Sequence, residues 1–424
     1  MDMLKITGGT PLYGIVPISG SKNATLPAMC ATLLTNEPVT LENVPWLSDT
    51  QFMGKILANL GTNCAKDMEN ADKYTYHTQV ITNSVAPYDL VRQMRASYYV
   101  LGPLLARNGA ATVSMPGGCV IGARPVDMHV DSLKQMGADI NIQNGYIVAN
   151  AEHGLHGAEL NFKTPSVGAT CNVLMAATLA NGQTIINNAA REPEIVDLAN
   201  MLNSMGAKVS GAGESVVQIE GVKKLTGTTH KIIADRIEAG SYAVAAAITR
   251  GKLELKNADA GTLGLPLDIL HKSGVDIQST QNTIVVDARG RELKGQDIIT
   301  AGYPGFPTDL QAQFMALMTT AKGDSTITEN IFENRLMHAP ELMRMGAHID
   351  KNTPNSAVVQ GVEKLDGCIV TASDLRAGFA LVLMGLAAQG DTFVRHLYHL
   401  ERGYVDLVGK LSNVDAKISR VKEK

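Results

Sequence analysis

The sequence predicts an α/β protein built from six repeats of about 70 residues, three in each of two domains. The first observation is an amphipathic helix that ends in a Gly-Ala-like step and precedes a short strand. It recurs around Gly61, Gly137, Gly206, Gly274, Gly346 and, in a degraded form, Asp415. These positions lie 76, 69, 68, 72 and 69 residues apart. A glycine just past the last helical turn is the usual left-handed cap.

The second observation is a largely apolar helix, rich in small residues, that ends near a glycine and precedes a β-rich run. Its six copies cover residues 23–37, 91–109, 166–182, 241–251, 310–323 and 375–390. A helix that is apolar on nearly all faces is buried. We therefore expect an inside-out α/β barrel in each domain, with the helices inside and the sheets outside. A continuous solenoid is the alternative, but standard solenoid repeats are shorter.

Length and composition limit the classes of protein. A chain of 424 residues suggests two or three domains, and the third repeat should give way to the fourth near Lys231–Asp235. A net charge of -4 and an aromatic content of 4% argue against nucleic acid as a partner. We see no apolar signal segment and no run long enough to span a bilayer, so we expect a cytoplasmic protein without a membrane partner.

The five cysteines are scattered and show no CxxC spacing, so we expect neither a metal site nor a disulfide framework. Cys119 stands apart because it lies in the glycine-rich stretch PGGCVIGARPVD, residues 116–127, together with Arg124. A nearby cation stabilises a thiolate, and a guanidinium can bind a carboxylate or phosphate in bidentate fashion. The alternative is a surface turn with a passive cysteine. We expect the other four cysteines to be buried packing residues.

A series of motifs resembles the enolpyruvyl transferases from Leu4 to Val421. In order they are SGSKNATLPA, MRAS, PGGCVIGARPVD, PSVGAT, REPEIVDLAN, DRIEAG, FPTDLQAQ, FENRLMH, SDLRAG and ERGY. The cysteine loop is the most discriminating motif, because the shikimate-pathway member of the family lacks it. The resemblance implies two inside-out α/β domains, residues 22–232 and residues 1–21 plus 233–424, with the active site in the cleft between them and no cofactor.

The activity that the resemblance implies is transfer of the enolpyruvyl group of phosphoenolpyruvate to the 3-hydroxyl of UDP-N-acetylglucosamine, with release of phosphate, in peptidoglycan synthesis. Cys119 would be the general acid and the target of the epoxide fosfomycin, and Asp309 would be the base. Thr308-Asp309 is also a good helix-capping pattern, and both interpretations can hold. Lys22, Asn23 and Arg402 would complete the catalytic set, with Lys22, Arg124 and Arg402 binding phosphoenolpyruvate.

The remaining binding residues are also carried over from the resemblance. Those for the sugar nucleotide are Arg124, Pro125, Val126, Asp127, Met128, Ser166, Val167 and Gly168, with Ile331 and Phe332 near the sugar. Those lining the cleft are Arg95, Arg335, Asp374 and Arg376. Surface ion pairing is the alternative for the charged residues, and core packing is the alternative for Phe332. Thr164 stands where some relatives have a diphosphate-binding lysine, with Lys163 one step earlier.

Three other functions remain open at this point. Another enolpyruvyl transferase, such as the one acting on shikimate 3-phosphate, would share the repeats but not the cysteine loop. A catalytically silent paralogue could bind the sugar nucleotide and regulate the pathway. A repeat-built scaffold would not need Lys22, Cys119, Asp309 and Arg402 together.

Overall fold

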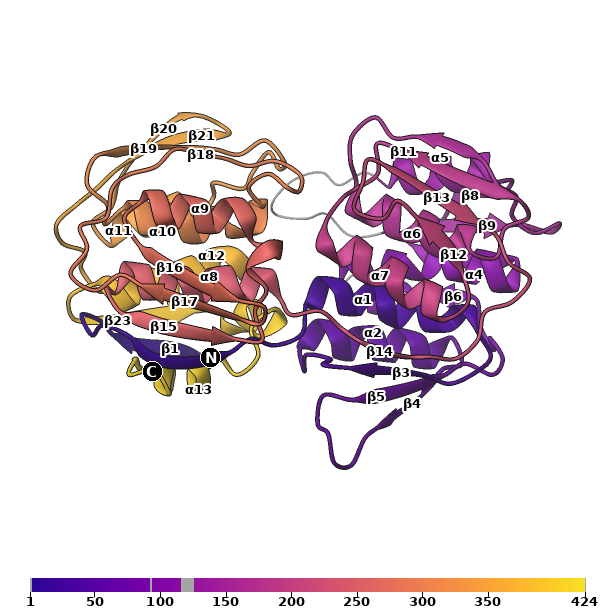
Figure 1. Cartoon of the computed structure of the whole chain (residues 1–424), viewed down its shortest axis with the longest axis horizontal. Coiled ribbons are helices and arrows are strands. Elements are labelled where there is room, and N and C mark those ends of the chain that lie inside the picture. Colours follow the sequence, from indigo (N-terminus) through magenta and orange to yellow (C-terminus); the bar gives the residue numbers. More distant parts are fainter. Residues whose placement is uncertain (1, 92–93, 116–125, 424) are drawn as a thin grey trace. The chain divides into compact units, whose positions relative to one another are not determined.

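The computed structural model describes residues 2–91, 94–115 and 126–423 (Figure 1). The chain divides into two compact units. The terminal unit comprises residues 2–19 and 234–423, so it contains both ends of the chain. The central unit comprises the described residues between 20 and 233. Each unit has its own hydrophobic core.

Six four-stranded sheets share one topology among the described residues: an edge strand runs parallel to its neighbour, and the next two strands are antiparallel. In the central unit the sheets are β14 (Thr229–Lys231), β3 (Val39–Glu42), β5 (Tyr74–His77), β4 (Asn63–Lys66); β6 (Val85–Ala86), β7 (Ala110–Ser114), β9 (Tyr146–Asn150), β8 (Asp139–Gln143); and β10 (Glu159–Asn161), β11 (Gln183–Asn187), β13 (Val216–Glu220), β12 (Lys208–Ser210).

The terminal unit repeats this topology three times. Its sheets are β2 (Tyr13–Pro17), β15 (Lys252–Lys256), β17 (Thr283–Asp287), β16 (Asp276–Thr280); β18 (Ile298–Ile299), β19 (Asp324–Thr328), β21 (Ser356–Gln360), β20 (His348–Thr353); and β22 (Ile369–Thr371), β23 (Asp391–Arg395), β1 (Asp2–Thr7), β24 (Lys417–Lys422). Side chains alternate between buried and less buried along the inner strands, as in β15, because one face of each sheet packs on the core.

Each sheet covers one inner helix. These are α1 (Lys22–Ala31), α4 (Leu101–Asn108), α6 (Val167–Ala177), α8 (Arg236–Ile248), α10 (Gln311–Met318) and α12 (Leu375–Ala387). All 13 residues of α8 and all 8 of α10 are buried. Figure 1 shows the inner helices α8, α10 and α12 lying between the sheets of the terminal unit. The predicted inside-out arrangement is therefore confirmed, and the reason is that these helices have no polar face to present to water.

The second set of helices is α2 (Ser48–Asn59), α5 (Asp127–Gln135), α7 (Pro193–Ser204), α9 (Gly264–Lys272), α11 (Ala339–Arg344) and α13 (Leu407–Ser412). The glycine after each of the first five has a φ between 94° and 107°, and Asp415 after the sixth has a φ of 73°. The predicted left-handed caps are confirmed, including the one without glycine. Shorter helical segments are α3 (Tyr88–Val91), η1 (Thr32–Leu34), η2 (Arg95–Val100), η3 (Ala260–Thr262), η4 (Thr308–Leu310) and η5 (Leu397–Arg402).

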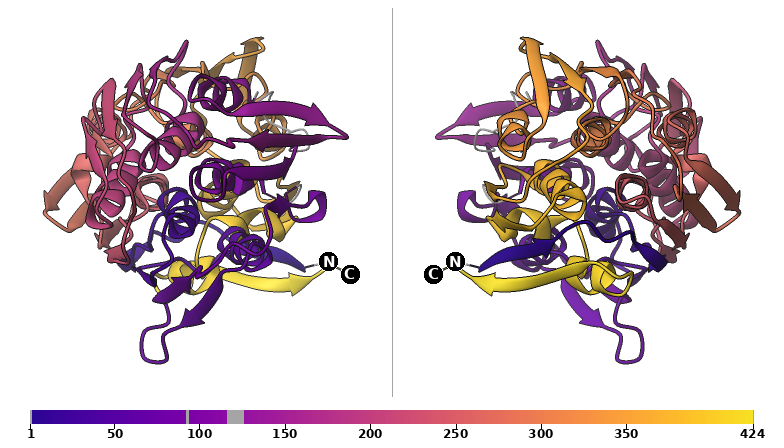
Figure 2. Two further views of the ribbon diagram at one scale, coloured as in Figure 1. Left: turned by 90° about the vertical axis from the view of Figure 1, so that its right-hand side faces the viewer. Right: turned by 90° about the vertical axis from the view of Figure 1, so that its left-hand side faces the viewer.

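Each unit is closed by strands from its two ends. In the central unit, β14 near the end of the unit runs parallel to β3 near its beginning. In the terminal unit, β1 runs antiparallel to β24, with Asp2 opposite Lys422, and Figure 2 shows the two chain ends side by side. Within the described ranges, the chain passes between the units after residue 19 and after residue 233, and Asp235 N donates to Ser19 O at 2.8 Å on the terminal unit's side of these boundaries. No helix in the described part of the chain is long and apolar enough to cross a membrane.

Candidate active site

Many candidate residues of the described chain lie where inner helices begin. In the central unit, Lys22 and Asn23 begin α1, and Ser166 caps α6 by accepting from Ala169 N at 3.3 Å. Val167 and Gly168 are the first residues of that helix. The first N–H groups of a helix lack intrahelical acceptors and carry a partial positive charge. These helix starts therefore suit the phosphate or carboxylate groups of a substrate.

The terminal unit follows the same rule. Asp309 lies in η4, which leads into α10, and Asp374 caps α12 by accepting from Arg376 N at 2.8 Å and Ala377 N at 3.1 Å. The N-cap residues of η4 and α10 are Pro307 and Leu310. Asp309 is therefore not the N-cap of either segment, whereas the chain does use Asp374 as a cap.

Asp309 is instead held by two arginines that were separate candidates in the sequence. Arg335 Nη2 donates to Asp309 Oδ1 and Arg376 Nη2 donates to Oδ2, both at 2.9 Å. The arginine side chains are only 6% and 5% exposed, whereas that of Asp309 is 28% exposed. Burial alone would lower the pKa of Arg376, but the charge of Asp309 raises it above its usual value. The carboxylate is therefore the accessible tip of a buried, positively charged cluster.

Sequence reasoning missed Glu329, which organises the loop beside this cluster. It is 1% exposed, and its carboxylate accepts from Thr308 Oγ1 at 2.8 Å, Ile331 N at 2.8 Å and Phe332 N at 3.1 Å. The candidates Ile331 and Phe332 are thus fixed by backbone hydrogen bonds. The Arg335 guanidinium lies 5.4 Å from the centroid of the Phe332 ring, so Phe332 is not simply a core residue.

Two histidines lie close to the charges of this site. His338 is 2% exposed, and burial lowers its pKa to about 4 although the charge of Asp374 opposes the shift. His338 is therefore neutral at neutral pH. His399 lies in η5 with Arg402, which ends that segment and is half-buried. Burial also lowers the pKa of His399. Neutral histidines add no positive charge to the arginine cluster.

In the central unit, Lys22 forms an ion pair that the sequence did not indicate. Its Nζ lies 3.1 Å from Asp49 Oδ2, and the two side chains are 12% and 3% exposed. Asp49 lies in the first turn of α2, so a second helix start fixes the lysine. Asn23, the next residue of α1, is half-buried. Lys22 is therefore not a solvated surface lysine.

The segment predicted to bind the sugar nucleotide is packed around His129. A β-carbon on Gly168 would lie 3.1 Å from the His129 ring, so the ring packs closely against this glycine. Asn172 Nδ2 lies 2.8 Å from His129 Nδ1 and also donates to Tyr98 O at 3.1 Å. Nearby, the Val126 side chain is buried, Met128 is half-buried and Asp127 is exposed. Lys163 and Thr164 are both exposed just before α6.

Several predictions fall outside the described residues. They concern Cys119, Arg124, Pro125 and the side chain of Arg95. Of the other cysteines, Cys30 and Cys171 are fully buried as predicted, but Cys64 is exposed on edge strand β4 and Cys368 is half-buried. Within the described ranges, no three His, Cys, Asp or Glu side chains are grouped so that they could hold a metal ion.

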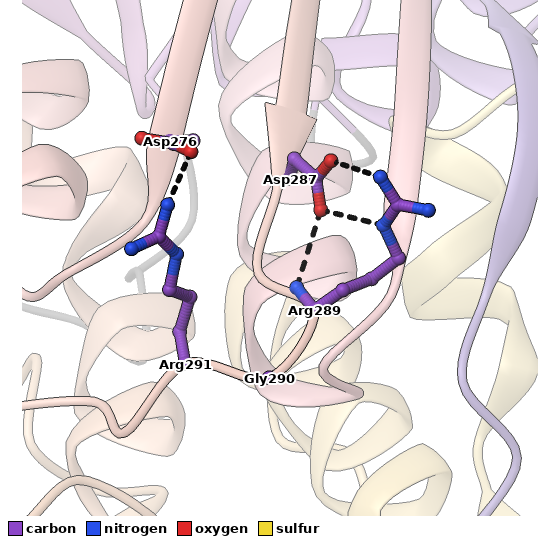
Figure 3. Close-up of a pocket in the computed structure, with 5 residues that line it drawn as sticks. All are labelled: Asp276, Asp287, Arg289, Gly290 and Arg291. Carbon is purple, nitrogen blue, oxygen red and sulfur yellow. Dashed lines mark hydrogen bonds and ion pairs between the residues drawn. The ribbon is translucent and has the colours of Figure 1, made fainter.

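A separate pocket of about 480 Å³ lies on an outer sheet of the terminal unit (Figure 3). It is lined by Asp276, Asp287, Arg289, Gly290 and Arg291, and none of the candidate residues lines it. Arg289 Nη2 lies 2.6 Å from Asp287 Oδ2, and Arg291 pairs with Asp276. Because each guanidinium already has a carboxylate partner, this pocket has little charge left to attract an anion.

Comparison with known proteins defines the class. A family model described as EPSP synthase (3-phosphoshikimate 1-carboxyvinyltransferase) matches residues 6–411. The fold is similar to that of the enolpyruvyl transferase NikO from Streptomyces tendae, with a TM-score of 0.90 at 24% identity over 100% of this chain and 99% of that one. An EPSP synthase from Acinetobacter baumannii gives a TM-score of 0.75 at 17% identity, with both chains fully covered. The chain therefore belongs to the EPSP synthase family, which comprises enolpyruvyl transferases.

More similar sequences define the particular group within this family. The chain is 52% identical over 423 residues to a UDP-N-acetylglucosamine 1-carboxyvinyltransferase from Caulobacter vibrioides, covering 100% of this chain and 98% of the relative. Proteins of the same name from Xanthobacter autotrophicus and Brucella ovis are 52% and 51% identical, covering 99% of this chain and 100% of each relative. Within the family, the chain therefore groups with the UDP-N-acetylglucosamine 1-carboxyvinyltransferases.

Proposed function

We propose that the chain transfers the enolpyruvyl group of phosphoenolpyruvate to the 3-hydroxyl of UDP-N-acetylglucosamine and releases phosphate, the first committed step of peptidoglycan synthesis. The observation that carries this proposal is identity of 51–52% along the full length of relatives that bear the corresponding name. The proposal includes a cytoplasmic location, because both substrates are intracellular metabolites. No metal or organic cofactor takes part in the proposed reaction.

Asp309 is the proposed base. The reaction adds the sugar hydroxyl to C2 of phosphoenolpyruvate and a proton to C3, then expels phosphate as that proton leaves. A carboxylate within hydrogen-bond reach of the hydroxyl can accept its proton. The two arginines that hold Asp309 at 2.9 Å support this role because they orient the carboxylate while its side chain stays 28% exposed to a substrate.

The substrate anions are bound by cations and helix starts. Lys22, which Asp49 fixes at 3.1 Å, contacts phosphoenolpyruvate together with Arg124 and Arg402. The backbone at the start of α6, from Ser166 to Gly168, faces the diphosphate of the sugar nucleotide. A substrate with a carboxylate and a phosphate needs several fixed cations, which is what this set of residues supplies.

Phosphate release tests the reaction directly. The protein is mixed with phosphoenolpyruvate and either UDP-N-acetylglucosamine or shikimate 3-phosphate, and inorganic phosphate is measured. Release that depends on UDP-N-acetylglucosamine alone is the expected result. Release with shikimate 3-phosphate alone would assign the chain to another branch of the family. Release with neither acceptor, from protein that circular dichroism shows to be folded, would overturn the enzymatic proposal and leave a binding paralogue.

A pair of matched variants tests the role of Asp309. Asp309→Asn should reduce kcat by about 10²–10⁴-fold, the usual contribution of general base catalysis. Asp276→Asn is the control, because Asp276 is also paired with an arginine but lines the outer pocket. It should leave kcat unchanged. Equal losses in the two variants would contradict a specific role for Asp309.

Cys119 is the proposed general acid and the site of covalent inhibition by fosfomycin. The support is its sequence context, since Arg124 lies five residues away and can stabilise the thiolate. Peptide mass spectrometry after incubation with fosfomycin should find the adduct on Cys119. Exposed Cys64 is an internal control for unspecific alkylation. Modification of both cysteines at similar rates would contradict an activated Cys119.

A further inference from the structure

One buried phenol in the terminal unit contacts all three of its inner helices. Tyr404, the last residue of the ERGY motif, is 3% exposed. Its hydroxyl lies 3.0 Å from Ser241 Oγ on α8, 3.3 Å from Gln313 Nε2 on α10 and 3.4 Å from Arg376 Nη1 on α12. Its ring stacks on Phe379, with the centroids 4.3 Å apart and the planes 26° from parallel. The position of the hydroxyl is therefore tightly determined.

Counting hydrogens gives the direction of these contacts. Ser241 has one hydroxyl hydrogen, which it donates to Ile237 O at 2.7 Å. The Tyr404 hydroxyl must then donate to Ser241 Oγ. Burial raises the pKa of Tyr404, so its hydroxyl keeps the hydrogen needed for this bond. A lone pair of this hydroxyl is left to accept from Arg376 Nη1, which carries only hydrogens. Gln313 Nε2 shares its two hydrogens among three oxygens: Asp309 O at 3.0 Å, Ser241 Oγ at 3.1 Å and the Tyr404 hydroxyl at 3.3 Å.

Arg376 and Gln313 also hold Asp309. Arg376 donates through Nη1 to Tyr404 and through Nη2 to Asp309 Oδ2 at 2.9 Å, so the two ends of its guanidinium are fixed. Gln313 Nε2 donates to the main-chain oxygen of Asp309 at 3.0 Å. Tyr404 thus supports the carboxylate through Arg376, and it shares Gln313 Nε2 as a donor with the main-chain oxygen of the same aspartate.

We propose that Tyr404 is a positioning residue for Asp309, acting through Arg376. The inference rests on the proposed function, because it assigns Asp309 as the base. Without the hydroxyl, the buried Arg376 loses the acceptor at Nη1 and its guanidinium can turn away from the geometry that orients the carboxylate. A small displacement of a catalytic group costs rate rather than substrate affinity.

The experiment compares Tyr404→Phe with Tyr242→Phe. Tyr242 is a matched control, because it is fully buried in the same core and its ring meets the other side chain of the stack, Phe379, at 5.7 Å. Its hydroxyl has no hydrogen-bond partner among the described residues. Each substitution removes one buried hydroxyl. Tyr404→Phe should reduce kcat by about 10–100-fold, by analogy with the outer-shell residues that orient metal ligands, with KM for both substrates within about twofold. Tyr242→Phe should retain the wild-type kcat.

A second readout does not depend on catalysis. The side-chain ¹⁵N spectrum of Arg376, assigned with Arg376→Lys, reports rotation of the guanidinium. Rotation should be slow in the wild type and in Tyr242→Phe and faster in Tyr404→Phe. Ser241→Ala, which removes the acceptor of the Tyr404 hydroxyl, should change rotation and kcat in the same direction by a smaller factor. It also serves as the second variant if Tyr404→Phe folds poorly.

The outcomes separate this inference from the proposed function. A wild-type kcat in folded Tyr404→Phe, or unchanged Arg376 rotation, would overturn the positioning role while leaving the enzyme assignment intact. An equal loss of kcat in Tyr404→Phe and Tyr242→Phe would also overturn it, since any buried hydroxyl would then matter. An inactive wild type would instead overturn the proposed function. If the wild type is inactive but Arg376 rotates faster in Tyr404→Phe, the Tyr404–Arg376 contact still fixes the guanidinium.

Discussion

Replacing Lys410 with methionine should strongly destabilise the terminal unit. Lys410 Nζ lies 2.7 Å from both Glu238 Oε1 and Ser19 Oγ, and the ion-paired side chains are 10% and 2% exposed. Ser19 N in turn donates to Glu238 Oε2 at 2.7 Å. The pair therefore fixes the point at which the chain leaves the terminal unit. Lys410→Met keeps most of the side-chain volume but leaves Glu238 buried without its counterion.

The magnitude follows from the distance and the burial. At 2.7 Å and an effective dielectric constant of about 20, the attraction is about 6 kcal/mol, part of which offsets desolvation of the two charges. Removing one partner of such a pair typically costs about 3–5 kcal/mol of the free energy of unfolding. Burial already raises the pKa of Glu238 against the opposing effect of Lys410, and the substitution raises it further. The deficit should therefore be largest at neutral pH and shrink as the pH falls toward the ordinary range of a glutamate.

Urea denaturation followed by far-UV circular dichroism at neutral and acidic pH measures this effect. Fluorescence of Trp46, the single tryptophan, separately follows the central unit. Lys322→Met is the control, because Lys322 and Glu292 pair at 3.1 Å but are 73% and 65% exposed, and its cost should stay within about 1 kcal/mol. The double variant Lys410→Met/Glu238→Gln should recover most of the loss. Equal effects of Lys410→Met and Lys322→Met, or no dependence on pH, would refute the reasoning.

Two further predictions concern stability. Because the pKa of His338 is about 4 when folded and about 6.5 when unfolded, protonation of the unfolded chain should cost the wild type about 2 kcal/mol between pH 7 and pH 5. His338→Gln should lack this component in urea titrations, and an unchanged slope would contradict a buried neutral histidine. A β-carbon on Gly361 would lie 1.6 Å from Ala321 O. Gly361→Ala should therefore lower the free energy of unfolding by about 3 kcal/mol and lower Tm. Gly302→Ala, which meets nothing within 4 Å, is its control, and equal Tm values would contradict the clash.

Local sequence patterns were sufficient to predict the repeats. The spacing of the capping glycines and the small apolar residues of helices such as α8 act within one turn or one helix, so each can be recognised without knowing its neighbours. Even Asp415, which lacks the glycine signal, adopts the left-handed conformation because the repeat around it demands the same turn.

The contacts of the site could not be predicted in this way. Asp309 meets Arg376 across 67 residues of sequence, and Tyr404 meets Ser241 across 163. Such pairs come together only when different repeats pack, and no local periodicity encodes them. In the sequence, Glu329 looks like any exposed glutamate, and only the tertiary structure shows that it is buried and organises a loop. The exposure of Cys64 was misjudged because β4 is an edge strand with both faces accessible.

The pairing of β1 with β24 and of β14 with β3 sets an order on biosynthesis. The central unit has all its strands once residue 231 has been made, so it can close while the chain is still being synthesised. The first strand of the chain, β1, cannot pair until β23 and β24 have been synthesised, when nearly the whole chain has been made. The same pairing brings the two termini together, with Asp2 opposite Lys422. The protein is therefore suited to circular permutation, in which a short linker joins the two ends and new termini are opened in a loop without breaking a sheet.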